Sequence, residues 1–261
     1  MNGLDKLAQG IGGAIDKVPE VYDDGLKTAT QESGKTLALI PRTINAALAP
    51  LRQWILQKEY NVAETEKLLA KKLENVCEET IVSPESYVAV PAIQAISYSM
   101  DSNELRNLYA NLLVKSMHID TKDLVHPSFV EIIKQLSPLD SLVFKRLMER
   151  RVNPMIDLIM KNAHGHFSTI TANVTDVDIA PQEQLGVSID NLAKQNLISI
   201  PADGYYTEES VYNGILQSQY YITQKESHNF IIDGFEFNYS KRMINKTNLG
   251  EAFYKICVLE I

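Results

Sequence analysis

Two histidines and the glycine between them form the segment whose residue types best suit metal binding. His164-Gly165-His166 places two imidazoles one residue apart, and imidazole nitrogen is a common ligand of zinc. Further ligands would have to come from Asp157 or Asp176, the only candidates that stand near the pair in the sequence. A solvated loop accounts for the same residues. We therefore predict no metal site, with His164 and His166 as the weak candidates for one.

Catalytic and nucleotide-binding patterns are incomplete in this chain. His118 and His126 could act as general bases, but that role needs a nucleophile or acid partner, and the sequence places none beside them. No serine stands in a Gly-x-Ser-x-Gly pattern. Ser33-Gly34-Lys35-Thr36 resembles the end of a phosphate-binding loop, yet Ala29 occupies the position of its first glycine. These observations predict no catalytic residues and no cofactor, and leave a nuclease with an unrecognised site as an alternative.

The composition limits the class of partner. The chain has 261 residues, which suits one large domain or two modest ones. It carries 25 Lys and Arg against 33 Asp and Glu, a net charge of -8. Non-specific binding to nucleic acid depends on basic side chains that neutralise phosphates, so this balance argues against DNA and leaves RNA undecided.

The compartment follows from cysteine usage and hydropathy. Cys77 and Cys257 each stand beside apolar residues, and two buried, reduced thiols are the expected arrangement. The first residues lack the basic and apolar segments of a signal peptide, and no apolar stretch reaches the roughly 20 residues of a membrane span. We predict a soluble, cytoplasmic protein.

Residues 1–136 are expected to form a helical bundle domain. Apolar residues recur every three or four positions at 37–55, 64–79 and 105–117, which is typical of amphipathic helices. Asp101 is expected to cap the third of these. Proline at a first helical position predicts helix starts at Pro91, Pro127 and Pro138. Short connections between such helices favour antiparallel packing in a bundle.

Residues 137–261 are expected to form a winged-helix-like domain, which makes the whole chain α+β. Strands are predicted at 155–160, 198–200, 220–223 and 230–239, with a helix at 182–196. From Arg151 to the end there are 8 Lys and Arg against 13 Asp and Glu. The expected recognition helix carries only Lys194 against Glu183 and Asp190. A protein contact or a purely structural role is therefore predicted for this domain rather than DNA binding.

The amphipathic segment 36–55 has a second interpretation. Its only charged residues are Arg42 and Arg52, and Trp54 lies near its end. Such a segment can lie on a membrane surface, although a helix of the bundle explains the same pattern.

Several runs of the sequence resemble the bacterial abortive infection alpha proteins. They are residues 34–37, 41–51 and 104–113, and the run His126-Pro127-Ser128-Phe129 through Ser137-Pro138-Leu139-Asp140. Residues 185–192 and Leu197-Ile198 resemble the later helix and strand of that family. The resemblance covers most of residues 20–200, and the run from His126 to Asp140 is its most specific part. It implies a role in resistance to phage, and the family provides no established catalytic residues to transfer.

The residues that carry the resemblance are interpreted as structural. Proline at two helix starts, with Asp140 at the second, predicts that the run fixes how two helices dock, and Asn111 is expected to be a buried amide. The motif residues are Asn111, His126, Pro127, Ser128, Pro138 and Asp140. The resulting hypothesis is a phage-defence protein that acts through a protein partner or self-association. A nuclease and a membrane-acting effector through 36–55 are the alternatives.

Overall fold

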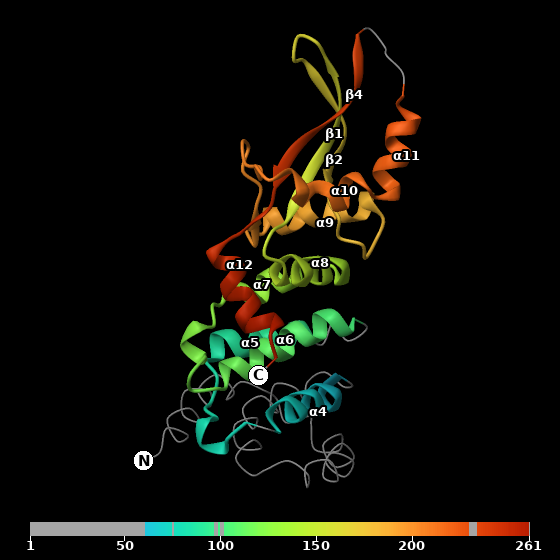
Figure 1. The fold of residues 1–261 in the computed structure, drawn as a ribbon. Coiled ribbons are helices and arrows are strands. Elements are labelled where there is room, and N and C mark those ends of the chain that lie inside the picture. Colours follow the sequence, from blue (N-terminus) through green and yellow to red (C-terminus); the bar gives the residue numbers. More distant parts are fainter. Residues whose placement is uncertain (1–60, 75, 97–98, 100–101, 230–233, 261) are drawn as a thin grey trace. The chain divides into compact units, whose positions relative to one another are not determined.

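The computed structural model describes residues 61–74, 76–96, 99, 102–229 and 234–260 (Figure 1). They divide into two compact units. The helical unit contains the described residues up to Gln135 together with 256–260, and the mixed unit contains those from Leu136 to Lys255. The predicted segment 36–55, the Ser33–Thr36 run and the expected cap Asp101 lie outside the described residues.

The helical unit is organised around α6 (Asn103–Ser116), which contacts three other helices. These are α4 (Asn61–Leu73), α5 (Ser86–Ile96) and α7 (Ser128–Lys134). Nine residues of α6 are buried, among them Leu112 and Leu113, which are fully inaccessible. The helix is capped by Ser102, whose Oγ accepts a hydrogen bond from the backbone N–H of Leu105 at 3.2 Å. The described cap is therefore Ser102 rather than the expected Asp101.

Two sequence predictions in this unit are wrong. Pro91 lies inside α5 instead of starting a helix. The carbonyl left without a partner by its missing N–H belongs to Tyr87, which is 59% exposed, so water can reach that turn. Cys77 is exposed rather than buried, because α4 ends at Leu73 and the apolar stripe stops with it. Cys257 is buried, as expected.

The mixed unit combines helices with antiparallel strands. Its sheet has the order β2-β1-β4, with β1 at Pro154–Asn162, β2 at Phe167–Val174 and β4 at Phe235–Met243. A second ladder pairs β3 (Ile198–Ser199) with β5 (Asn245–Lys246). The helices are α8 (Pro138–Glu149), α9 (Gln182–Lys194), α10 (Asn213–Leu216), α11 (Gln219–Ser227) and α12 (Asn248–Phe253).

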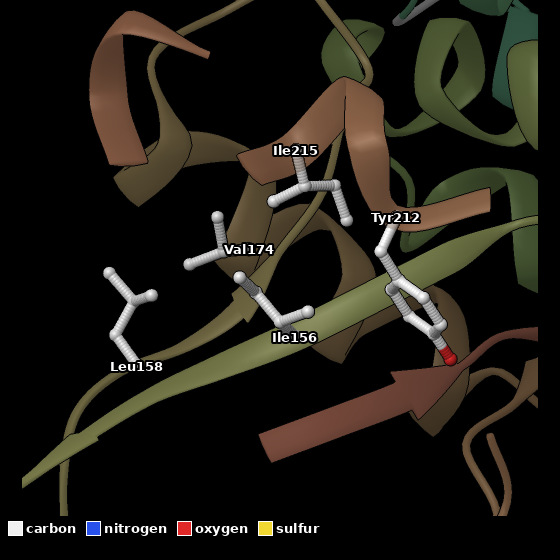
Figure 2. Close-up of a cluster of buried hydrophobic side chains, with 5 residues drawn as sticks. All are labelled: Ile156, Leu158, Val174, Tyr212 and Ile215. Carbon is white, nitrogen blue, oxygen red and sulfur yellow. The ribbon is translucent and has the colours of Figure 1, made fainter. Parts of the chain in front are cut away.

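A cluster of apolar side chains forms the core on one face of this sheet. It contains Ile156, Leu158, Val174, Tyr212 and Ile215, all fully buried (Figure 2). Ile156 and Leu158 alternate along β1 and so point to the same face. The hydroxyl of Tyr212 accepts from the N–H of Tyr206 at 2.9 Å and donates to the carbonyl of Arg242 at 3.1 Å. The hydroxyl of this buried tyrosine therefore has a hydrogen-bond partner for both its donor and its acceptor role.

The strand predictions have mixed outcomes. The strand predicted at 155–160 lies within β1, and the segment predicted at 198–200 contains β3. The segment 220–223 is helical, because it lies in α11, so that prediction is wrong. The strand predicted at 230–239 overlaps β4, which begins at Phe235, while 230–233 lie outside the described residues.

The described fold is α+β, as predicted, since helices are combined with small antiparallel sheets. Among the helices that the structure describes, none has the length and apolar character needed to cross a bilayer.

Candidate functional residues

Asp140 is a buried carboxylate that joins two helices of the mixed unit. It stands three residues after Ser137 at the start of α8, where the two form a capping box. Ser137 Oγ accepts from the Asp140 N–H at 3.1 Å, and Asp140 Oδ2 accepts from the Ser137 N–H at 2.7 Å. From α9, Ser188 donates to Oδ1 and the Asn191 amide donates to Oδ2 at 2.9 Å. The carboxylate is 5% exposed, so it caps one helix and fastens it to another.

The helix start at Pro127 is stabilised by a histidine. Nδ1 of His126 accepts from the Ser128 N–H at 3.1 Å and lies 2.7 Å from Ser128 Oγ. A backbone N–H can only donate, so Nδ1 carries no proton in this arrangement and the hydroxyl donates to it. Pro127, at the N-cap of α7, has φ -56. His126 thus takes part in the turn that begins α7, beside Phe129, whose ring centroid lies 6.0 Å from its own.

His118 lies two residues beyond α6, and its Nδ1 accepts from the backbone N–H of Asp120 at 3.2 Å. The carboxylate of Asp120 is 3.9 Å from the same nitrogen. The residue also forms an isolated β-bridge with Ile81. The described side-chain contacts of His118 therefore belong to the turn that follows α6, and its backbone pairs with the segment before α5.

Asn111 is buried on α6 and binds the returning C-terminal segment of the helical unit. Its Nδ2 donates to the carbonyl of Cys257 at 2.9 Å and lies 3.4 Å from that of Val258. The side chain is 3% exposed. Farther along, Lys72 on α4 forms an ion pair with Glu260. The predicted buried amide is therefore present, and its partner is the backbone 146 residues later.

Two ionisable groups lie beside Asn111. Burial raises the pKa of the Cys257 thiol, and the nearby ammonium of Lys115 opposes that rise only in part. Burial lowers the pKa of Lys115, against smaller opposing effects of Cys257 and Glu260. Burial also raises the pKa of Tyr109 on the same helix. The interior of the helical unit therefore favours the neutral form of each group.

These shifts predict a loss of stability at alkaline pH. Above pH 9.0, the usual pKa of a cysteine thiol, Cys257 ionises in the unfolded chain but stays neutral in the folded unit. Its contribution is complete below that pH and decreases as the pH rises beyond it, by at most about 1.4 kcal/mol per pH unit. Because burial lowers the pKa of Lys115, its contribution to stability rises with pH up to its usual pKa of 10.5, opposite to that of Cys257. Urea unfolding of C257A between pH 8 and 11 should therefore show a shallower decline than wild type.

The control for this experiment is C77A, which removes an exposed thiol. It should reproduce the wild-type decline with pH. Equal slopes for wild type and C257A would contradict the assignment, whatever the absolute stability of C257A.

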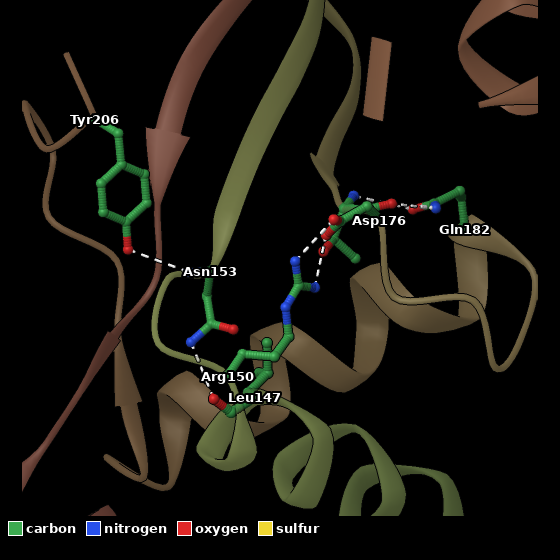
Figure 3. Close-up of polar contacts among 7 residues, drawn as sticks. Leu147, Arg150, Asn153, Asp176, Gln182 and Tyr206 are labelled. Atoms are coloured by element: carbon green, nitrogen blue, oxygen red, sulfur yellow. Dashed lines mark hydrogen bonds and ion pairs between the residues drawn. The ribbon is translucent and has the colours of Figure 1, made fainter. Parts of the chain in front are cut away.

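A second polar cluster lies where α8, β1, β2 and α9 meet (Figure 3). Arg150 binds Asp176 through two hydrogen bonds of 2.7 Å each, and the side chain of Gln182 pairs with the backbone of Thr175. The amide of Asn153 donates to the carbonyl of Leu147 at 3.0 Å. This cluster fixes the chain between the end of α8 and the start of α9.

The candidate metal ligands are not brought together. His164 and His166 are exposed at the β1–β2 turn, where Asn162 Oδ1 accepts from both of their backbone N–H groups. Asp157 pairs with Arg242 at 2.9 Å and Asp176 with Arg150. In the part of the chain that the structure describes, no group of three or more His, Cys, Asp or Glu residues is placed to hold a metal ion.

Sequence reasoning missed the partners of Asp140. Ser188 and Asn191 stand three residues apart on α9, so they lie on one face of the helix. Two polar residues at that spacing, on the same side as the buried Leu185 and Leu192, indicate in the sequence that this face of α9 makes a polar contact with another helix. Nothing local connects them with α8.

The fold and these clusters define an α+β protein in which buried polar side chains fasten helices to each other and to the chain end. Among known families, the model called Abortive infection alpha matches residues 57–257, which is more than half of the chain. The chain belongs to this family. No curated protein and no solved structure matches it.

Proposed function

We propose that this chain is a bacterial anti-phage defence protein that acts through contacts with a protein partner or with further copies of itself. The observation that carries the proposal is its membership of the abortive infection alpha family over residues 57–257. The placement of Asn111, His126 and Asp140 supports the mode of action. Each uses polar atoms in hydrogen bonds within its own unit, which suits a scaffold that presents a surface.

The proposed architecture is a helical bundle domain over 1–136 and a winged-helix-like domain over 137–261. The order of α8, α9 and the β3–β5 ladder supports the second assignment. On α9, which would be the recognition helix, the acidic Glu183 and Asp190 outnumber Lys194. A protein partner suits this helix better than DNA does, because DNA-reading helices present Arg or Lys to phosphates and bases.

Exposed apolar side chains offer places for such a contact. In the helical unit they include Leu124, which is 61% exposed, and in the mixed unit Phe167 and Val187, at 63% and 70%. Single exposed apolar residues are common on protein surfaces. Each therefore has to be tested separately, and together they provide a set of substitutions that should leave the fold intact.

The test is phage plaquing on cells that express the full chain with Leu124→Glu, Phe167→Glu or Val187→Glu. The proposal predicts that at least one substitution raises plaque counts about 10-fold or more, with unchanged protein level and melting temperature. The same substitution should remove a cross-linked complex from phage-infected cells. D178N, at an exposed carboxylate, is the control.

The competing functions give different results in this assay. If all three variants retain resistance and no complex is recovered, contact is not the mode of action. Degraded RNA in infected cells would then favour a nuclease, and leakage of the membrane would favour an effector that acts through 36–55.

A further inference from the structure

Two helices of the mixed unit, α8 and α9, have exposed faces whose charges follow opposite orders. On α8, Leu142, Lys145 and Glu149 are exposed, and their spacing of three and four residues places them on one side of the helix. Leu142 is 45% exposed although its side chain is apolar. The outer face of α8 therefore presents, from its start to its end, an apolar, a basic and an acidic residue.

The outer face of α9 has the same spacing with the charges reversed. Val187, Asp190 and Lys194 are exposed, and the apolar Val187 is 70% exposed. Oδ1 of Asp190 accepts a hydrogen bond from Nδ2 of Asn173 at 2.7 Å, which leaves Oδ2 available to a cation. In the same direction along the helix, this face presents an apolar, an acidic and a basic residue.

Most of these charges are free to pair with another molecule. In the part of the chain that the structure describes, Lys145, Glu149 and Lys194 form no ion pair with another residue. Two further exposed residues strengthen the contrast between the faces. Arg146 adds positive charge beside Leu142 on α8, and Glu183 adds negative charge one turn before Val187 on α9.

Within one chain, α8 and α9 use their other faces to pack on each other. Asp140 on α8 binds Ser188 and Asn191 on α9. The helices run in opposite directions, because Asp140 in the first turn of α8 meets Asn191 in the last turn of α9. At the opposite ends, Arg150, the C-cap of α8, binds Asp176, which precedes α9. The complement of each outer face is therefore the other outer face of a second copy.

A parallel contact between copies aligns the two faces residue by residue. Both helices rise by the same distance per residue, so Leu142 of one copy can be set beside Val187 of the next. The residues three positions on are then Lys145 and Asp190, and those seven positions on are acidic on α8 and basic on α9. An antiparallel contact about the same apolar pair sets Lys145 opposite the uncharged Gln184 instead. The charge order thus selects the parallel arrangement.

We propose that copies of this chain associate head to tail, with the outer face of α8 of one copy packed in parallel on the outer face of α9 of the next. The apolar pair is buried by the contact, and the two pairs of opposite charge set its direction and register. Each contact uses a different face on either copy, so every added copy leaves one face open and association continues beyond the dimer. This inference rests on the proposed function, because it selects self-association as the mode of contact and names its surface.

Charge exchange within one face tests the contact. K145E/E149K reverses the face of α8 and D190K/K194E reverses that of α9, and neither changes the net charge. In sedimentation of the full chain, wild type should form species larger than a dimer as its concentration rises. Each variant alone should associate at least about 10-fold more weakly, because like charges then meet across the contact. An equimolar mixture of both variants should recover wild-type association, because the two reversed faces complement each other and so do the two unaltered ones.

The matched control is K225E/E226K, which exchanges two exposed charges on α11 and should associate as wild type does. A wild-type chain that stays monomeric, an assembly that ends at the dimer, or a mixture of folded variants that does not recover association would overturn the proposal, as would equal association of wild type and either face variant. No phage is involved in these measurements. A monomeric chain would leave defence through a different protein standing, and a lack of phage resistance would leave the association standing.

Discussion

D140A is expected to lower the free energy of unfolding of the mixed unit by about 3 kcal/mol. Ser137 still caps α8 through the backbone N–H of residue 140, but the Ser137 N–H loses its acceptor on the carboxylate, which costs about 1 kcal/mol. The donors on Ser188 and Asn191 lose their acceptor in a site where Asp140 is 5% exposed, and a buried donor without a partner costs about 1–3 kcal/mol. Urea unfolding followed by near-ultraviolet circular dichroism measures the change.

Two further substitutions separate the carboxylate from its surroundings. D140N retains the shape and one acceptor oxygen, and its amide can donate to the Ser188 hydroxyl, so we expect a loss of about 1 kcal/mol. D178N, at an exposed carboxylate, should change the stability by less than about 0.5 kcal/mol. If D140A were as stable as D178N, the hydrogen bonds to α9 would have no energetic role.

N111L is expected to destabilise the helical unit by about 2 kcal/mol. The apolar side chain has the same number of heavy atoms and the same branching, but it is larger and leaves the carbonyl of Cys257 without the donor 2.9 Å away. N111D should cost more, because it directs a carboxylate oxygen at the same carbonyl inside a buried site. Thermal unfolding measures this loss of stability. Hydrogen exchange of the backbone amides in residues 256–260 shows whether the C-terminal segment has been released.

The control for Asn111 is N107L on the exposed side of α6. It should cost less than about 0.5 kcal/mol, since no buried group loses a partner. A cost for N111L as small as that for N107L would show that the contact with the C-terminal segment does not hold it in place.

Local sequence signals predicted the start of α8 correctly, placed that of α7 one residue early at Pro127, and were wrong at Pro91. The start of α8 could be read from Ser137, Pro138 and Asp140 because a capping box lies within four residues. The partners of Asp140 could not, because Ser188 stands 48 residues away and meets it only after α8 and α9 pack. The same holds for Asn111, whose polarity on an apolar helix was visible but whose partner on the returning chain was not.

The errors come from tertiary contacts that outweigh local preference. Residues 220–223 are β-favouring, yet they are helical in α11, where Tyr221 packs on Phe237 and Tyr239. Pro91 disfavours a helix interior, yet Ala92 and Ile93 beside it are buried in α5. In both cases the information lies in another segment of the chain.

The polar motif residues build the fold, and we propose that defence arises from contact with a partner. Plaque counts on cells that express H118A, H126A or both, at matched levels of folded protein, test it most directly. At these matched levels we expect each variant to keep the wild-type resistance and cellular RNA to stay intact. Loss of resistance in a variant with unchanged melting temperature, together with RNA cleavage by the wild-type protein that the variant lacks, would contradict it.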